Sequence, residues 1–207
     1  MKEEEILRLK NMWNIEDALA QRGYTLIAGV DEAGRGPLAG SVYAAAVILP
    51  HGMMLEGLND SKKISEKKRE KLYEDIKANA LCYCVATATA EEIDELNIRN
   101  ATYVAMNRAI DGLLKKVDYV LVDGDCIKDC AYPHECVVKG DAKSASIAAA
   151  SILAKVERDR YMLEMAKKYP QYSFEKHKGY GTAVHIAALK EFGPCEIHRK
   201  TFIKKFV

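Results

Sequence analysis

The stretch Gly29-Val30-Asp31-Glu32-Ala33-Gly34-Arg35-Gly36-Pro37 says more about fold and chemistry than any other part of this chain. Two adjacent carboxylates, Asp31 and Glu32, end an apolar run and are followed by a glycine-flanked arginine. Like charges a few ångströms apart resist joint ionisation, and a divalent cation such as Mg²⁺ or Mn²⁺ relieves that repulsion through oxygen ligands. The N–H groups and guanidinium of Gly34-Arg35-Gly36 suit a phosphodiester. The pattern indicates metal-dependent chemistry on a nucleic acid, with a solvated strand end as the alternative.

Two further acids favour the chemical interpretation. Asp123 ends the apolar strand pattern in 118–124, and Asp141 ends a second one in 137–141, just before an Ala/Ser-rich helical stretch. In α/β proteins functional groups gather at strand ends and in the following loops, because the rigid sheet positions them. Three separate sites with a carboxylate at a strand end are hard to explain as solvent-exposed acids without a function.

The composition is that of a soluble globular protein. The chain has 207 residues, a net charge of +1, 49% hydrophobic residues and 29% charged residues, which suits one domain. No apolar run approaches the roughly 20 residues of a membrane span, and the acidic start at Glu3, Glu4 and Glu5 does not resemble a signal peptide. We expect a cytoplasmic monomer that has no association with membranes.

Alternating strand and helix patterns predict an α/β protein with a mixed central sheet flanked by helices. Ser65 is the expected N-cap of a helix that packs through Leu72, Tyr73 and Ile76. The strands are expected at 24–31, 42–49, 81–89, 119–123 and 135–138. The helices are expected at about 1–20, 65–78, 99–116, 144–168 and 182–192.

Six motifs in the chain resemble, in order, those of bacterial type 2 ribonuclease H, the ribonuclease HII family. They span roughly residues 24–200 and are Gly29–Gly40, Leu58–Lys63, Val122–Gly124, Lys139–Asp141, Ala149–Val156 and His177–Thr182. The resemblance implies a ribonuclease H-like fold with a helical C-terminal cap from about 167 and a duplex-binding groove between core and cap. It also divides the chain into an N-terminal helical extension, 1–23, and a type 2 domain, 24–207.

The implied activity is that of an endoribonuclease. Such an enzyme hydrolyses the RNA strand of RNA–DNA hybrids and nicks 5′ of ribonucleotides embedded in duplex DNA, leaving 5′-phosphate and 3′-hydroxyl ends. Its implied roles are removal of RNA primers and of misincorporated ribonucleotides. Two Mn²⁺ or Mg²⁺ ions would support the hydrolysis. The resemblance assigns both catalysis and metal binding to Asp31, Glu32, Asp123 and Asp141, with Asp31 bridging the ions.

Two features of this assignment depend on local geometry. Consecutive strand residues point to opposite faces, so Asp31 and Glu32 are expected to share a site only if the backbone leaves strand geometry there. Asp141 has a second interpretation as a capping carboxylate for the helix that follows.

The resemblance also implies residues that bind the substrate. Recognition of the ribose 2′-hydroxyl is assigned to the Gly34-Arg35-Gly36 turn and Tyr180, for which a buried structural tyrosine is the alternative. The other implied substrate-binding residues are Asn59, Lys62 and Lys63, and for both lysines we expect phosphate contact. The cations in 67–71 are expected on a solvated helix face. His177, Lys178 and His185 are expected as phosphate contacts or helix surface.

Several features stand outside the resemblance. Ser41 replaces a common proline, and 125–136 is a divergent loop with Cys126, Cys130, His134 and Cys136, whose spacing favours free thiols over zinc. We do not expect the sister enzyme ribonuclease HIII, because its added N-terminal domain and its lack of Gly-Arg-Gly do not fit this sequence. A nucleic-acid-binding protein without the chemistry and a nucleotidase remain alternatives, although 34–41 does not match a P-loop.

Overall fold

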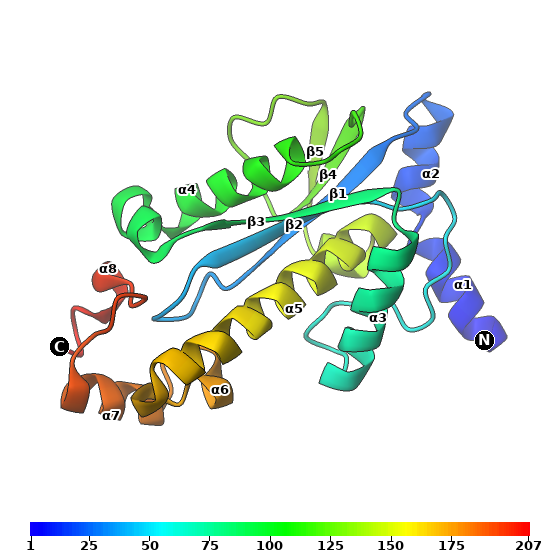
Figure 1. Ribbon diagram of the computed structural model, residues 1–207. Helices are drawn as coiled ribbons and strands as arrows, with labels where there is room; N and C mark the ends of the chain where they lie inside the picture. The colour runs from blue at the N-terminus through cyan, green and yellow to red at the C-terminus, as the bar shows by residue number, and fades with distance from the viewer.

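A computed structural model describes residues 1–207, and its centre is a five-stranded mixed sheet (Figure 1). The strand order is β3-β2-β1-β4-β5. The strands are β1 (Ile27–Ala33), β2 (Val42–Ile48), β3 (Cys82–Ala88), β4 (Tyr119–Asp123) and β5 (His134–Val137). Strands β1, β2 and β3 form an antiparallel meander, whereas β4 and β5 run parallel to β1. The predicted mixed sheet is confirmed.

Helices cover both faces of the sheet. Helix α4 (Ala90–Asp111) packs on one face, where its apolar residues join Val30, Val42 and Ile48 in a buried cluster. Helices α3 (Glu66–Asn79) and α5 (Ala145–Lys168) cover the other face (Figure 1). Helix α5 packs closely on β1 at Gly29, because a Cβ added to this glycine would lie 2.1 Å from the Ser146 carbonyl carbon.

The N-terminal residues form two helices, α1 (Glu3–Asn11) and α2 (Asn14–Gln21), where one was expected. They pack onto the domain, since Leu9, Met12 and Trp13 are buried in the same cluster as the α5 face of the sheet. The division at residue 23 therefore marks a change in sequence motifs but does not separate two cores. None of the helices in the structure combines the length and apolar character that crossing a membrane requires.

Capping explains where two helices begin. The Ser65 hydroxyl accepts a hydrogen bond from the N–H of Lys68, which confirms the predicted N-cap of α3. Helix α4 begins nine residues before its predicted start at 99, because Thr89 and Glu92 form a capping box. A kink at Asn97, with φ of 65°, divides α4, and its second half is the predicted helix.

The C-terminal residues form a cap beside the end of α5 (Figure 1). It contains a 3-10 turn, η2 (Pro170–Tyr172), followed by α6 (Phe174–His177), α7 (Ala183–Phe192) and α8 (Lys200–Ile203). Its own apolar cluster includes Tyr172, Phe174 and Leu189. Because His177 and His185 are buried in this cap, their expected place on the surface is wrong.

Three hydrogen bonds in the cap assign neutral forms to two histidines. The Cys195 N–H donates to His198 Nδ1 over 2.9 Å, so His198 carries its proton on Nε2 and donates to His185 Nε2, also over 2.9 Å. His185 then donates from Nδ1 to the Tyr180 carbonyl oxygen over 2.9 Å. A further proton on either ring would point at an N–H donor. Burial and the electrostatic effect of His185 both lower the pKa of His198, which is about 4.

We therefore expect the cap to lose stability in acid. The pKa of His198 is lower in the folded than in the unfolded chain, so its stabilising contribution is present above pH 6.5 and is lost as pH falls toward 4. The loss between pH 7.5 and 5 should be about 2 kcal/mol in unfolding free energy. Urea unfolding at both pH values measures it. The variant His198→Asn, which keeps an acceptor near Nδ1 but cannot titrate, should show a shallower dependence, and an unchanged dependence would contradict the assignment.

Candidate active site

The sheet brings the predicted acids to one edge. Strands β1 and β4 are parallel, and Val30 lies opposite Val122, so Asp31 and Asp123 are the next residues along the two strands. Strand β4 stops at Asp123, while β1 continues to Ala33 beside β2 alone. The neighbouring strand β5 leads into a 3-10 turn, η1 (Gly140–Ala142), which carries Asp141. This open edge gathers side chains that lie up to 110 residues apart.

Asp31, Glu32, Asp123 and Asp141 are called the acidic group below. Asp31 lies at its centre and is only 5% exposed. Burial raises its pKa well above the ordinary value, and the carboxylates of Glu32 and Asp123 raise it further. Two hydrogen bonds to the Asp31 carboxylate oppose this rise in pKa. One comes from the Ser151 hydroxyl of α5, and the other comes from the Glu32 N–H, whose nitrogen lies 2.6 Å from Asp31 Oδ1. The folded chain therefore holds the Asp31 carboxyl in surroundings that disfavour its ionised form.

Glu32 reaches the same edge from the other face of the sheet. Asp31 and Glu32 both keep antiparallel pairing with β2, so the expected departure from strand geometry is wrong. Glu32 lines a cleft with Tyr103 and Met106 of α4, whereas the α5 face lies on the Asp31 side. Both side chains lie near the Asp123 carboxylate, because β4 ends at Asp123 beside them. Burial and the charge of Asp123 raise the pKa of Glu32, although Arg35 opposes the shift from 3.5 Å away.

Asp141 belongs to the acidic group and does not cap α5. Ser144 occupies the N-cap position, where its hydroxyl accepts from the N–H of Ile147, so the capping interpretation of Asp141 is wrong. Burial raises the pKa of Asp141, as do the neighbouring carboxylates of Asp60 and Asp123. The Gly140 N–H donates to Asp123 Oδ1 over 2.6 Å, which ties η1 to the end of β4.

The glycine-rich turn lies against the cap. Gly34 has φ of 97°, a left-handed conformation that suits glycine. The Leu38 N–H donates to the Gly179 carbonyl oxygen over 2.8 Å, and a Cβ added to Gly36 would lie 3.6 Å from the Tyr180 ring. Tyr180 is 45% exposed, so the interpretation as a buried structural tyrosine is wrong. The structure brings the turn and Tyr180 together.

A cleft of about 660 Å³ runs between the core and the cap. Its lining includes Glu32, the 33–36 turn, Lys62 and Tyr180. It also contains three cations that were not predicted as site residues, Arg69, Lys155 and Arg158. Arg69 therefore does not belong to the solvated helix face expected for 67–71. Burial lowers the pKa of Lys62, but the charges of Asp31, Asp60 and Asp141 outweigh it and raise the pKa overall.

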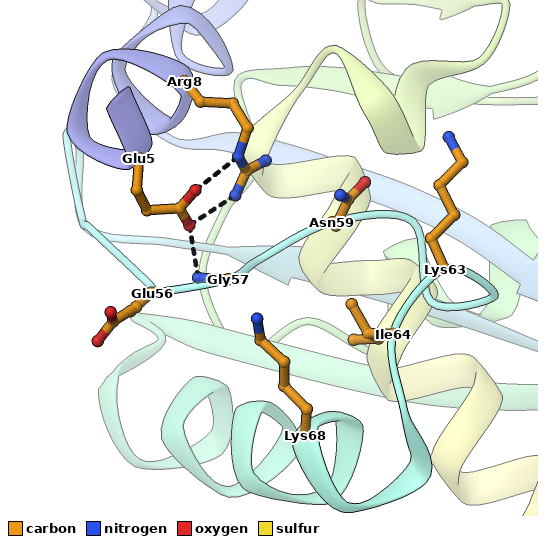
Figure 2. A pocket seen from close by; sticks show the side chains of 8 residues that line it. All are labelled: Glu5, Arg8, Glu56, Gly57, Asn59, Lys63, Ile64 and Lys68. Carbon is orange, nitrogen blue, oxygen red and sulfur yellow. Dashed lines mark hydrogen bonds and ion pairs between the residues drawn. The ribbon is translucent and has the colours of Figure 1, made fainter. Parts of the chain in front are cut away.

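The loop at 56–64 also lines a second cleft, of about 300 Å³ (Figure 2). Asn59 and Lys63 line the second cleft together with Arg8 and Lys68. Glu5 of α1 ties the loop down, because its carboxylate accepts from the Gly57 N–H over 2.8 Å and pairs with Arg8 (Figure 2). The structure thus places Lys62 in the cleft beside the acids and Lys63 in the neighbouring one.

The acidic group fits divalent cations in its chemistry. Oxygen donors dominate it, and three of its carboxyls have raised pKa values caused by burial and mutual repulsion. In this conformation, however, no three Asp, Glu, His or Cys side chains converge closely enough to hold an ion. All six cysteines are free thiols, including Cys126, Cys130 and Cys136.

This sheet, with carboxylates at its open edge and a cationic cleft beside them, defines a nuclease of the ribonuclease H class. The sequence model of the family described as Ribonuclease HII matches residues 28–205 of this chain. Ribonuclease HII of Caldicellulosiruptor bescii is 54% identical over 198 residues, which are 96% of each chain. The chain belongs to the ribonuclease HII family and is an endoribonuclease that acts on RNA–DNA hybrids with a divalent metal.

Solved structures agree with this assignment. The ribonuclease H2 from Pyrococcus horikoshii OT3 has a TM-score of 0.74 and 27% identity, covering 88% of this chain and 97% of its own. The Bst-RNase HIII in complex with Mn²⁺ has a TM-score of 0.68 and 17% identity, covering 84% of this chain and 63% of its own. The latter likeness shows the fold alone.

Proposed function

We propose that Asp31, Glu32, Asp123 and Asp141 form the catalytic centre and hold two divalent ions, either Mn²⁺ or Mg²⁺. The observation that carries this proposal is the buried Asp31 carboxyl, whose charge is disfavoured by burial and by two neighbouring carboxylates. Bound cations offset that repulsion, and when present they activate water and stabilise the leaving 3′ oxygen. The Bst-RNase HIII that shares this fold was solved in complex with Mn²⁺, which is one of the two proposed ions.

The chain's own groups hold and orient the substrate. Lys62, Arg69 and Lys155 line the cleft and would contact phosphates of the duplex. The N–H groups of the Gly34–Gly36 turn would meet the ribose 2′-hydroxyl, and Tyr180 would stack on the adjacent sugar. This pairing is supported by the contact between turn and tyrosine. It would let the enzyme nick 5′ of a single ribonucleotide in duplex DNA, leaving 5′-phosphate and 3′-hydroxyl ends.

The cellular setting follows from that reaction. The substrates would be RNA–DNA hybrids left by primers and duplex DNA with misincorporated ribonucleotides. We propose a monomer, because one chain supplies every residue assigned to the site. The expected location, the cytoplasm, is where bacterial DNA is replicated.

The direct test is cleavage of a duplex with one embedded ribonucleotide, titrated with Mg²⁺ or Mn²⁺ after removal of metal by EDTA. We expect no product without metal and a nick on the 5′ side of the ribonucleotide when metal is restored. An all-DNA duplex is the matched control substrate and should remain intact. Tight, metal-independent binding without cleavage would instead favour a nucleic-acid-binding protein that has lost the chemistry.

The two lysines of the loop should differ in their effect on binding. Lys62→Ala should weaken binding to hybrids of any sequence and lower the slope of log Kd against log salt by about 1, because one phosphate contact is lost. Lys63→Ala, which removes the same charge from the neighbouring cleft, is the matched control. Fluorescence anisotropy at several salt concentrations measures both. Equal effects would mean that the duplex spans both clefts, and an unchanged slope for Lys62→Ala would remove it from the phosphate contacts.

A further inference from the structure

Two arginines are fully buried behind the glycine-rich turn. Arg158 lies in α5 and Arg199 immediately precedes α8, and both side chains are 0% exposed. They come from segments about 40 residues apart and converge on residues 34–41. Buried charges are uncommon in proteins unless they are hydrogen-bonded.

Each hydrogen bond that these guanidiniums donate ends on a backbone carbonyl oxygen. From Arg199, Nη1 donates to Arg35 over 2.8 Å, Nη2 to Gly34 over 2.5 Å, and Nε to Gly40 over 2.9 Å. Arg158 donates to Ala39 over 3.2 Å and to Ser41 over 3.3 Å. The planar fork of arginine can satisfy several carbonyls at once, which a lysine ammonium cannot reproduce with the same geometry.

Arg158 also connects the turn to the segment that carries Tyr180. Its Nη1 donates to the Lys178 carbonyl oxygen over 3.1 Å, two residues before that tyrosine. The turn also closes directly on Arg158, because a Cβ added to Gly34 would lie 2.0 Å from Arg158 Nε. The guanidiniums therefore hold both parts of the proposed sugar-reading surface in one arrangement.

Neither arginine is held there by a carboxylate. Neither guanidinium forms an ion pair, and burial together with the charge of Arg158 lowers the pKa of Arg199 to about 9. Two like charges packed side by side disfavour folding unless other contacts offset the repulsion. Here the offsetting contacts are the carbonyls of 34–41 and Lys178. Because the C=O and N–H of a trans peptide point in opposite directions, the N–H groups of Arg35 and Gly36 point away from the Arg199 guanidinium that binds the Gly34 and Arg35 carbonyls.

We propose that Arg158 and Arg199 are positioning residues that fix the Gly34–Gly36 turn against Tyr180 and thereby set the selectivity for a ribonucleotide at the cleaved bond. The inference rests on the proposed roles of the turn and Tyr180 in reading the sugar. Neither arginine needs to touch the substrate. A turn displaced by about 1 Å would still leave the metal-binding acids in place but would misalign the 2′-hydroxyl.

The test compares kcat/KM on a duplex with one embedded ribonucleotide and on a continuous RNA–DNA hybrid. Arg199→Lys keeps a positive charge but loses the fork. We expect its ratio of single-ribonucleotide to hybrid cleavage to fall about tenfold. A continuous hybrid presents several 2′-hydroxyls and tolerates a displaced turn better. The ratio does not depend on the fraction of folded enzyme.

Controls separate positioning from general destabilisation. Ile203→Ala removes a buried side chain from the same cap and contacts no carbonyl of the turn, so it should lower both activities equally. Should Arg199→Lys fail to fold, Arg158→Lys tests the same idea through Ala39 and Lys178. Faster hydrogen exchange of the Gly34–Gly36 amides should accompany the loss of selectivity.

Two outcomes would overturn the inference in distinguishable ways. If Arg199→Lys and Arg158→Lys fold and keep the wild-type ratio while Tyr180→Ala changes it, the arginines do not position the sugar-reading surface. If Tyr180→Ala also leaves the ratio unchanged, the proposed sugar-reading surface itself is wrong.

Discussion

Replacing Asp31 with asparagine is expected to lower kcat by about 10³-fold while changing the Kd for a hybrid by no more than a few-fold. The change removes one negative charge from the centre of the acidic group and leaves the cations of the cleft in place. In metal-free buffer at pH 7.5 the variant should also unfold at a higher temperature. The raised pKa of Asp31 means that its charge destabilises the folded chain above the unfolded pKa, and asparagine removes that charge.

Single-turnover cleavage and anisotropy measure the two activities separately. Asp111→Asn, at the exposed end of α4, is the matched control and should behave as the wild type in each assay. Residual activity of Asp31→Asn above a few per cent at saturating Mg²⁺ or Mn²⁺ would show that the metal-site assignment is wrong. A loss of activity that accompanies a lower unfolding temperature would indicate damage to the sheet instead.

Replacing Tyr180 with alanine is expected to reduce cleavage at a single embedded ribonucleotide by about 10²-fold, and cleavage of a continuous hybrid much less. With one ribonucleotide there is one productive register, and stacking on the adjacent sugar must secure it. In a continuous hybrid, neighbouring 2′-hydroxyls allow other registers. Arg35→Ala should depress both substrates alike, because a phosphate contact does not depend on how many ribonucleotides lie nearby.

Comparing kcat/KM on both duplexes in one buffer cancels general folding defects. Tyr180→Phe is the matched control for stacking, since it keeps the ring and loses only the hydroxyl, and it should retain most of the selectivity. Equal losses on the two substrates for Tyr180→Ala would show that the tyrosine supports the loop and does not read the sugar.

Much of the local structure could be predicted from the sequence. Strand β4 was predicted at its observed limits, and β2 and β3 within a residue at each end, because their apolar residues are bounded by turns. The start of α3 was predicted because Ser65 carries a capping side chain. The early start of α4 was missed although Thr89 and Glu92 carry the capping-box signal, since the helix kinks at Asn97 and has no continuous apolar stripe across that point.

From the sequence by itself we could identify four candidate carboxylates at or near strand ends, a glycine-flanked arginine and a tyrosine in a glycine-flanked loop. These signals lie in short segments, where neighbouring residues define the pattern. Only the tertiary structure decided the strand order and the arrival of Glu32 from the opposite face. It alone decided the separation of Lys62 from Lys63 and the two arginines behind the turn. Those features depend on contacts between residues as far apart as Gly34 and Arg199, which side-chain periodicity cannot encode, because it reports which face is buried and not what covers it.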